Sequence, residues 1–200
     1  MTKNSLFLFL LTILVSSCGK SFDTQDEMTV YIADEDHGYQ YKKTVNGVDY
    51  ILQYRPTDLL VKQELPSKYN DKQVAILRAK YHKYLYFNLS MSKNNQELLN
   101  GLARDKQKIG QMVSDLAFGM DEKVHLYTPE KDTLEIADFI YPRMYGMTNA
   151  TVIMLVYPRE EKYMKSDYLN FAIEDLGLDT GEIKFRVNTQ NLQQEPQLRF

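Results

Sequence analysis

The sequence predicts an α+β protein that is mostly β, built as an antiparallel sheet or β-sandwich with one main helix. Several segments alternate apolar and polar residues with a period of two, which is typical of half-buried strands. The chain also has fifteen tyrosines and no tryptophan, and tyrosine is common in strands. Only the segment at 96–118 has a long stripe of apolar residues at helical spacing. Strands joined by hairpins, with one helix among them, favour this fold class.

The strongest local signal is a hairpin centred on Asn46-Gly47. These two residues adopt the positive φ angles of a type I′ turn, so strands at 39–45 and 48–54 are expected to pair. Pro56 then ends the second strand and begins a short helix near 57–65. A second short helix is predicted near 71–80, with weaker periodicity.

The segment 84–92 alternates cleanly and predicts a strand with one face in the core. Its core face carries Leu85, Phe87, Leu89 and Met91. From Asn94 the period changes, because Asn94 and Glu97 have the spacing of a capping box and apolar residues then recur on one helical stripe. The main helix is therefore expected at about 96–118, ending at Gly119.

After Gly119 almost every segment is predicted to be a strand. The expected strands are 123–128, 133–141, 150–157, 168–174 and 182–187. Within the second of these, Asp138 shares a face with apolar residues, which indicates either a buried carboxylate with a raised pKa or a bulge that turns it outward. The tail at 188–200 is rich in glutamine and is predicted to be only partly ordered.

The N-terminus has the pattern of an export signal. Lys3 precedes an apolar run at Leu6–Val15, and this run is too short to span a bilayer but fits the apolar region of a cleaved signal peptide. The run leads into Val15-Ser16-Ser17-Cys18, which contains the only cysteine of the chain. We expect residues 1–17 to be removed.

The segment Val15-Ser16-Ser17-Cys18 resembles the lipobox of bacterial lipoproteins. The resemblance implies that Cys18 is acylated and becomes the first residue of a chain anchored to the cell envelope, with Gly19 favouring the outer membrane. Whether the protein faces the periplasm or the cell surface stays open, and an ordinary secretory signal is the alternative. Polar residues at 18–29 then predict a flexible tether, and 30–200 a single β-rich domain.

The charge balance argues against one class of partner. A formal net charge of −3 provides no basic field for nucleic acid. With a single cysteine, the chain cannot form an internal disulfide.

Candidate chemical groups are few. Asp34, Asp36 and His37 form a small group of oxygen and nitrogen ligands that could hold a divalent cation, although a solvated acidic loop is the alternative. Their spacing does not match an EF-hand loop. We expect no cofactor, and no nucleophile elbow, phosphate-binding loop or free catalytic thiol is present in the sequence.

Four tyrosines are candidates for a binding surface. Tyr84 and Tyr86 share one face of a predicted strand, while Tyr141 and Tyr145 lie in a predicted loop around Pro142. Tyrosine contributes strongly to protein interfaces, because it buries a large ring at low entropic cost. Half-exposed packing residues are the alternative.

The sequence as a whole favours a membrane-anchored lipoprotein that binds a protein partner or helps to assemble an envelope complex, without catalysis. Two alternatives remain. One is a periplasmic hydrolase or glycan-acting enzyme that uses carboxylates such as Asp138 or those of 34–37. The other is a protective lipoprotein that blocks an incoming toxin.

Overall fold

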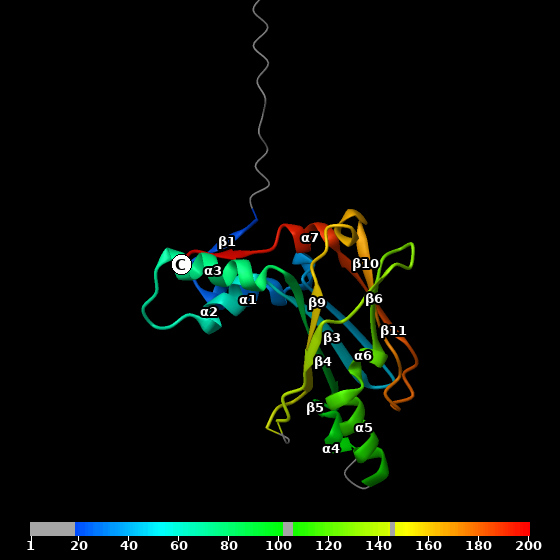
Figure 1. Cartoon of the computed structure of the whole chain (residues 1–200). Coiled ribbons are helices and arrows are strands. Elements are labelled where there is room, and N and C mark those ends of the chain that lie inside the picture. Colours follow the sequence, from blue (N-terminus) through cyan, green and yellow to red (C-terminus); the bar gives the residue numbers. More distant parts are fainter. Residues whose placement is uncertain (1–18, 102–105, 145–146) are drawn as a thin grey trace, which may run out of the picture.

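The structure is a computed structural model and describes residues 19–101, 106–144 and 147–200. Within these ranges two antiparallel sheets share one apolar core, and helices lie at opposite ends of the molecule (Figure 1). The α+β class with antiparallel sheets is therefore confirmed.

The larger sheet has six strands, with the order β2-β3-β4-β9-β8 and β5 beside β4. Their bounds are β2 (Gln40–Val45), β3 (Val48–Arg55), β4 (Tyr84–Lys93), β5 (Gln96–Glu97), β8 (Asp138–Ile140) and β9 (Thr151–Pro158). The smaller sheet has the order β11-β10-β6-β7. Its strands are β6 (Val124–Tyr127), β7 (Thr133–Leu134), β10 (Tyr168–Ile173) and β11 (Ile183–Asn188).

The predicted hairpin forms in the expected register. Val45 lies opposite Val48, and Asn46 and Gly47 have φ angles of 50° and 73°. These angles are the type I′ geometry that matches the twist of the flanking strands. The hairpin makes β2 the edge strand of the larger sheet.

The core lies between the two sheets. The predicted core face of β4 is confirmed, since Leu85, Phe87, Leu89 and Met91 are all fully buried. Phe87 packs against Phe171 of β10, with 6.5 Å between the ring centroids. Burying one such side chain contributes about 1.5–3 kcal/mol, so this layer holds the two sheets together.

Seven α-helices are described. They are α1 (Gln25–Ala33), α2 (Thr57–Glu64), α3 (Asp71–Tyr81), α4 (Leu98–Gly101), α5 (Lys106–Phe118), α6 (Met120–Lys123) and α7 (Thr189–Gln193). The two short helices predicted near 57–65 and 71–80 are confirmed as α2 and α3. Asn70 and Gln73 form a capping box that begins α3.

The prediction that the main helix begins with a capping box at Asn94 is wrong. Asn94 and Asn95 have φ angles of 55° and 57°, and Lys93 pairs with Gln96. The two asparagines therefore make a tight hairpin turn into β5, because asparagine tolerates the left-handed conformation that this turn requires. Helix follows in two described parts, α4 and α5, and 102–105 lie outside the described residues.

The predicted strand at 133–141 is also split. Its first part, β7, pairs with β6 in the smaller sheet, and its second part, β8, pairs with β9 in the larger sheet. Asp138 begins β8 and is exposed, with its Oδ1 accepting a hydrogen bond from Phe139 N at 2.8 Å. Of the two alternatives for Asp138, the outward orientation is confirmed, because the chain changes sheets just before it.

Both polar end segments are ordered where they are described, which corrects the flexible tether predicted over 18–29 and the partly ordered tail predicted over 188–200. The strands β1 (Ser21–Phe22) and β12 (Gln197–Leu198) pair in parallel, and Figure 1 shows the two segments side by side. Gly19 allows a close approach, since a Cβ there would lie 2.7 Å from the carbonyl oxygen of Glu195. Hydrogen bonds between strand backbones and at helix caps order these two segments. Such bonds need no periodic apolar residues, so the sequence pattern did not predict the order.

Candidate functional site

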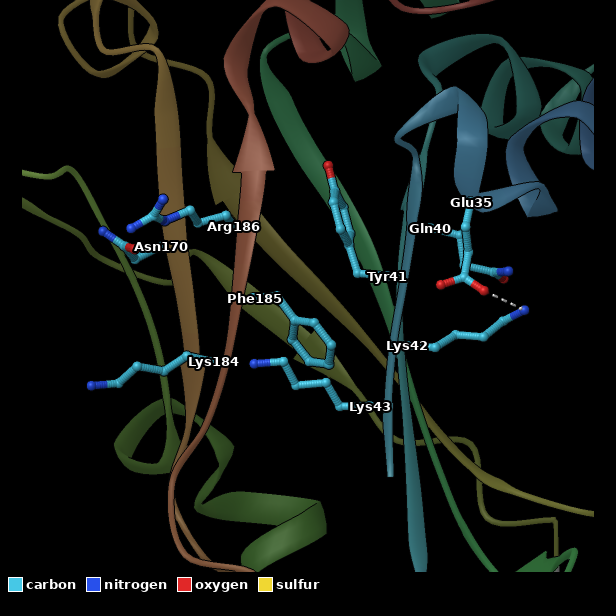
Figure 2. A pocket seen from close by; sticks show the side chains of 9 residues that line it. All are labelled: Glu35, Gln40, Tyr41, Lys42, Lys43, Asn170, Lys184, Phe185 and Arg186. Carbon is cyan, nitrogen blue, oxygen red and sulfur yellow. Dashed lines mark ion pairs between the residues drawn. The ribbon is translucent and has the colours of Figure 1, made fainter. Parts of the chain in front are cut away.

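A groove of about 580 Å³ lies between the edge strands of the two sheets, β2 and β11. Figure 2 shows the rings of Tyr41 and Phe185, with Lys43, between the two strands. The groove is lined by Glu35, Gln40, Tyr41, Lys42, Lys43, Asn170, Lys184, Phe185 and Arg186. Two strand edges therefore border one groove, and neither has a further strand beyond it in the described part of the chain.

Polar contacts connect the two strands at each end of the groove. At one end, Asn188 N donates to Tyr41 Oη at 3.3 Å, and this hydroxyl donates to the carbonyl oxygen of Gly38 at 2.7 Å. Burial raises the pKa of Tyr41, so the phenol stays neutral and can donate. At the other end, the Asn46 side-chain amide donates to the carbonyl oxygen of Asp179. These contacts join the two sides of the groove at both of its ends.

The groove is positively charged. Its lining includes four cationic side chains and one carboxylate, a formal balance of +3: Lys42, Lys43, Lys184, Arg186 and Glu35. Lys42 pairs with Glu35 at 3.1 Å, and Lys184 pairs with Glu182, just outside the lining, at 2.5 Å. Exposed pairs of this kind contribute only about 0–1 kcal/mol, so both lysines can exchange partners when an anionic ligand arrives.

Two of the cations also lie over aromatic rings. Lys43 Nζ is 5.6 Å from the centroid of the Phe185 ring, and the Arg186 guanidinium is 4.6 Å from that of Tyr168. Such contacts restrain long side chains, which lowers the entropy that a ligand must remove. The groove therefore presents charged side chains and aromatic rings along two strand edges.

A second polar cluster surrounds Glu195, whose side chain is 7% exposed. Its carboxylate accepts hydrogen bonds from Tyr54 Oη at 2.7 Å and from both the backbone N and Oγ1 of Thr57 at 2.8 Å. His82 Nδ1 and Arg159 also lie within 3.1 Å of Oε1. Five donor groups therefore surround this carboxylate, which also lines a cavity of about 280 Å³.

Burial raises the pKa of Glu195, but the His82 contact, the Arg159 charge and the other hydrogen bonds outweigh it and hold this pKa below its usual value. An ionised, fully bonded carboxylate is a poor proton donor. Cavities of about 600 and 280 Å³ flank the cluster, and both are lined by His82 and Gln193. The cluster is best described as a clamp that fixes the C-terminal segment.

A neighbouring buried carboxylate completes this clamp. Asp58 receives Nε and Nη2 of Arg78 at 2.7 and 2.6 Å, and also Leu198 N at 2.7 Å. Arg78 Nη2 reaches the carbonyl oxygen of Leu198 at 2.9 Å. Helices α2 and α3 are therefore joined to β12, and through β12 to β1, by charge-assisted hydrogen bonds.

The described tyrosines among those predicted as a binding surface do not form one exposed patch. Tyr86 is only 6% exposed and packs with Leu60 and Val156, so its assignment to an exposed surface is wrong. Tyr84 is 36% exposed and contacts Tyr86, with 6.3 Å between the ring centroids. Tyr141 packs against the core between the sheets, away from that pair. Tyr145 lies outside the described residues.

The candidate cation ligands have structural contacts instead. Asp34 caps the 3₁₀ turn Glu35–His37 by accepting from Asp36 N at 3.0 Å. His37 stacks on Tyr31, with 3.7 Å between the ring centroids, and its Nδ1 lies 2.9 Å from the carbonyl oxygen of Tyr31. Within the described ranges, no three His, Cys, Asp or Glu side chains are grouped as metal ligands would be.

The predicted acylation site, Cys18, lies outside the described residues. Among those that are described, none of the helices combines the length and apolar character needed to cross a bilayer. The first described strand begins at Ser21, three residues after this cysteine.

Sequence reasoning found neither the groove nor the Glu195 clamp. The groove brings together β2 and β11, which are more than a hundred residues apart in the sequence. The only signal for it in the sequence is the basic residues of these two strands. The clamp left no signal, because Tyr54 and Glu195 are 141 positions apart.

Comparison with known proteins adds no relative: no family model matches the chain, and no match to a curated protein or a solved structure was found.

Proposed function

We propose that this protein is a lipoprotein of the cell envelope, anchored through Cys18, that binds a protein partner in the groove between β2 and β11. The observation that carries the proposal is the pair of open strand edges facing one positively charged groove. An exposed strand edge is a template for pairing with another chain, and natural proteins usually cover it unless it serves for binding.

The anchor and the fold fit together in this proposal. Only Gly19 and Lys20 lie between Cys18 and β1. An extended chain spans at most about 3.6 Å per residue, so the lipid would hold the β1 and β12 end within about 10 Å of the membrane. The Asn46-Gly47 turn lies at the end of β2 that is farther from β1. In this proposal the turn would therefore point away from the membrane.

Site-specific crosslinking in intact cells tests the proposal. A photoreactive residue at Lys43 or Lys184, both in the groove lining, should give one discrete adduct with the same envelope protein. The matched control is the exposed Lys72 of α3, which should not give this adduct. The proposal is contradicted if positions 43 and 184 yield no adduct, or the same adducts as position 72.

The identity of the captured protein also separates the assembly role from the toxin-blocking one. A resident envelope protein supports the first, and a protein that appears only when a competitor strain is present supports the second.

The geometry does not support one form of the hydrolase alternative, in which Asp138 and the 34–37 group would act together. Asp138 lies on β8 at one edge of the larger sheet, while residues 34–37 precede β2 at its other edge. Two carboxylates must lie within about 10 Å of each other to act on one glycosidic bond. Asp138 and the 34–37 group therefore do not form one catalytic pair.

A further inference from the structure

The backbone of β11 has free hydrogen-bonding groups on the side that faces the groove. Thr189 N donates to the carbonyl oxygen of Asp167 at 3.2 Å, and the register places Leu169 opposite Val187. Hydrogen-bonded pairs alternate along antiparallel strands, so the odd-numbered residues of β11 bond to β10. Lys184 and Arg186 therefore direct their N–H and C=O groups toward the open edge. The bond from Asn188 N to Tyr41 across the groove confirms this direction.

The same register argument identifies the β2 residues that face the open edge. The side chains around this edge are less suited to an acidic ligand. Tyr54 N donates to the carbonyl oxygen of Tyr39 at 2.8 Å, so the even-numbered residues of β2 face the open edge. However, the side chain of Lys42 is already paired with Glu35, which would repel an acidic ligand. On β11, Lys184 is also paired, with Glu182, but Glu182 precedes the strand and lies outside the groove lining, whereas Glu35 lines the groove. The Arg186 guanidinium lies over the Tyr168 ring.

We propose that the groove takes an extended acidic segment of the partner, which adds as a strand to β11. This inference deepens the function proposed above and rests on it. Side chains of adjacent strands on one face lie about 5 Å apart, so carboxylates at every second position of the segment would lie beside Lys184 and Arg186. The residue between them would face Phe185 and Tyr41, whose rings lie inside the groove (Figure 2).

A defined peptide tests this mode of binding on the full mature chain in detergent. The probe is a short peptide of alternating Glu and Val, compared with one of alternating Lys and Val. Only the acidic peptide should bind, as measured by fluorescence anisotropy. Equal binding of both peptides, or of neither, would overturn the assignment of an acidic segment.

Charge reversal locates the site. The double variant Lys184→Glu, Arg186→Glu should weaken binding of the acidic peptide by about tenfold or more, because two favourable contacts become repulsive. The control variant Lys68→Glu, Lys72→Glu makes the same change in net charge at exposed positions near or on α3 and should leave the affinity unchanged. Equal loss in both variants would mean that net charge alone attracts the peptide.

Amide hydrogen exchange then identifies the edge. The acidic peptide should slow exchange at the amides of Lys184 and Arg186, which are free in the unbound protein. Slowing at Lys42 and Thr44 instead would place the strand on β2 and overturn the choice of β11. If crosslinking at Lys43 and Lys184 succeeds while these peptide experiments fail, the binding function stands and only the acidic strand is rejected.

Discussion

Replacing Glu195 by Gln should lower the free energy of unfolding by about 3–5 kcal/mol, because it leaves the buried Arg159 without its counter-charge. The side chains of Arg159 and Glu195 are 9% and 7% exposed, so little water can compensate. Urea unfolding measures the effect as a lower midpoint with an unchanged slope.

The matched control is Glu130→Gln, a change at an exposed residue in the loop between β6 and β7. It should alter the free energy of unfolding by no more than about 0.5 kcal/mol. A loss of less than about 1 kcal/mol in Glu195→Gln would show that the clamp contributes little to stability.

The same carboxylate predicts a pH dependence. Its pKa in the folded protein is lower than the ordinary value of 4.5, so the unfolded chain binds a proton more readily than the folded one. The stabilisation is complete above about pH 4.5 and is lost as the pH falls through the folded pKa. The difference in unfolding free energy between wild type and Glu195→Gln should therefore shrink as the pH is lowered below about 4.5.

Replacing Cys18 by Ala should release the protein from membranes or leave it unprocessed. The thiol is the only acceptor for the lipid in the lipobox resemblance, and Ala offers no atom to acylate. Several acyl chains make attachment effectively stable, since each buried methylene adds about 0.8 kcal/mol. Membrane fractionation together with the mass of the mature chain measures the outcome.

Ser17→Ala provides the control, because it keeps a small residue before the cysteine and should be processed and anchored like the wild type. A Cys18→Ala protein that is cleaved correctly and stays with the membrane would contradict the lipid anchor. Binding of the acidic peptide to the purified protein would still test the groove independently.

Local patterns predicted the elements whose cause is local. The Asn46-Gly47 turn, α2, α3 and the core face of β4 all form where the sequence places them, because turn chemistry and side-chain periodicity act over a few residues. The errors arose where two local interpretations competed. Asn94 can cap a helix or turn a hairpin, and pairing of Lys93 with Gln96 selected the hairpin.

The sequence by itself determined the α+β class and most of the strands, since both depend on composition or short-range periodicity. It also predicts the export pattern at the N-terminus. Only the tertiary structure decided the order of both end segments, the burial of Tyr86 and the groove between β2 and β11. These features depend on contacts such as that of Tyr54 with Glu195, 141 positions away. A polar residue in a glutamine-rich tail becomes buried when distant donors satisfy its charge, and no local pattern records where those donors are.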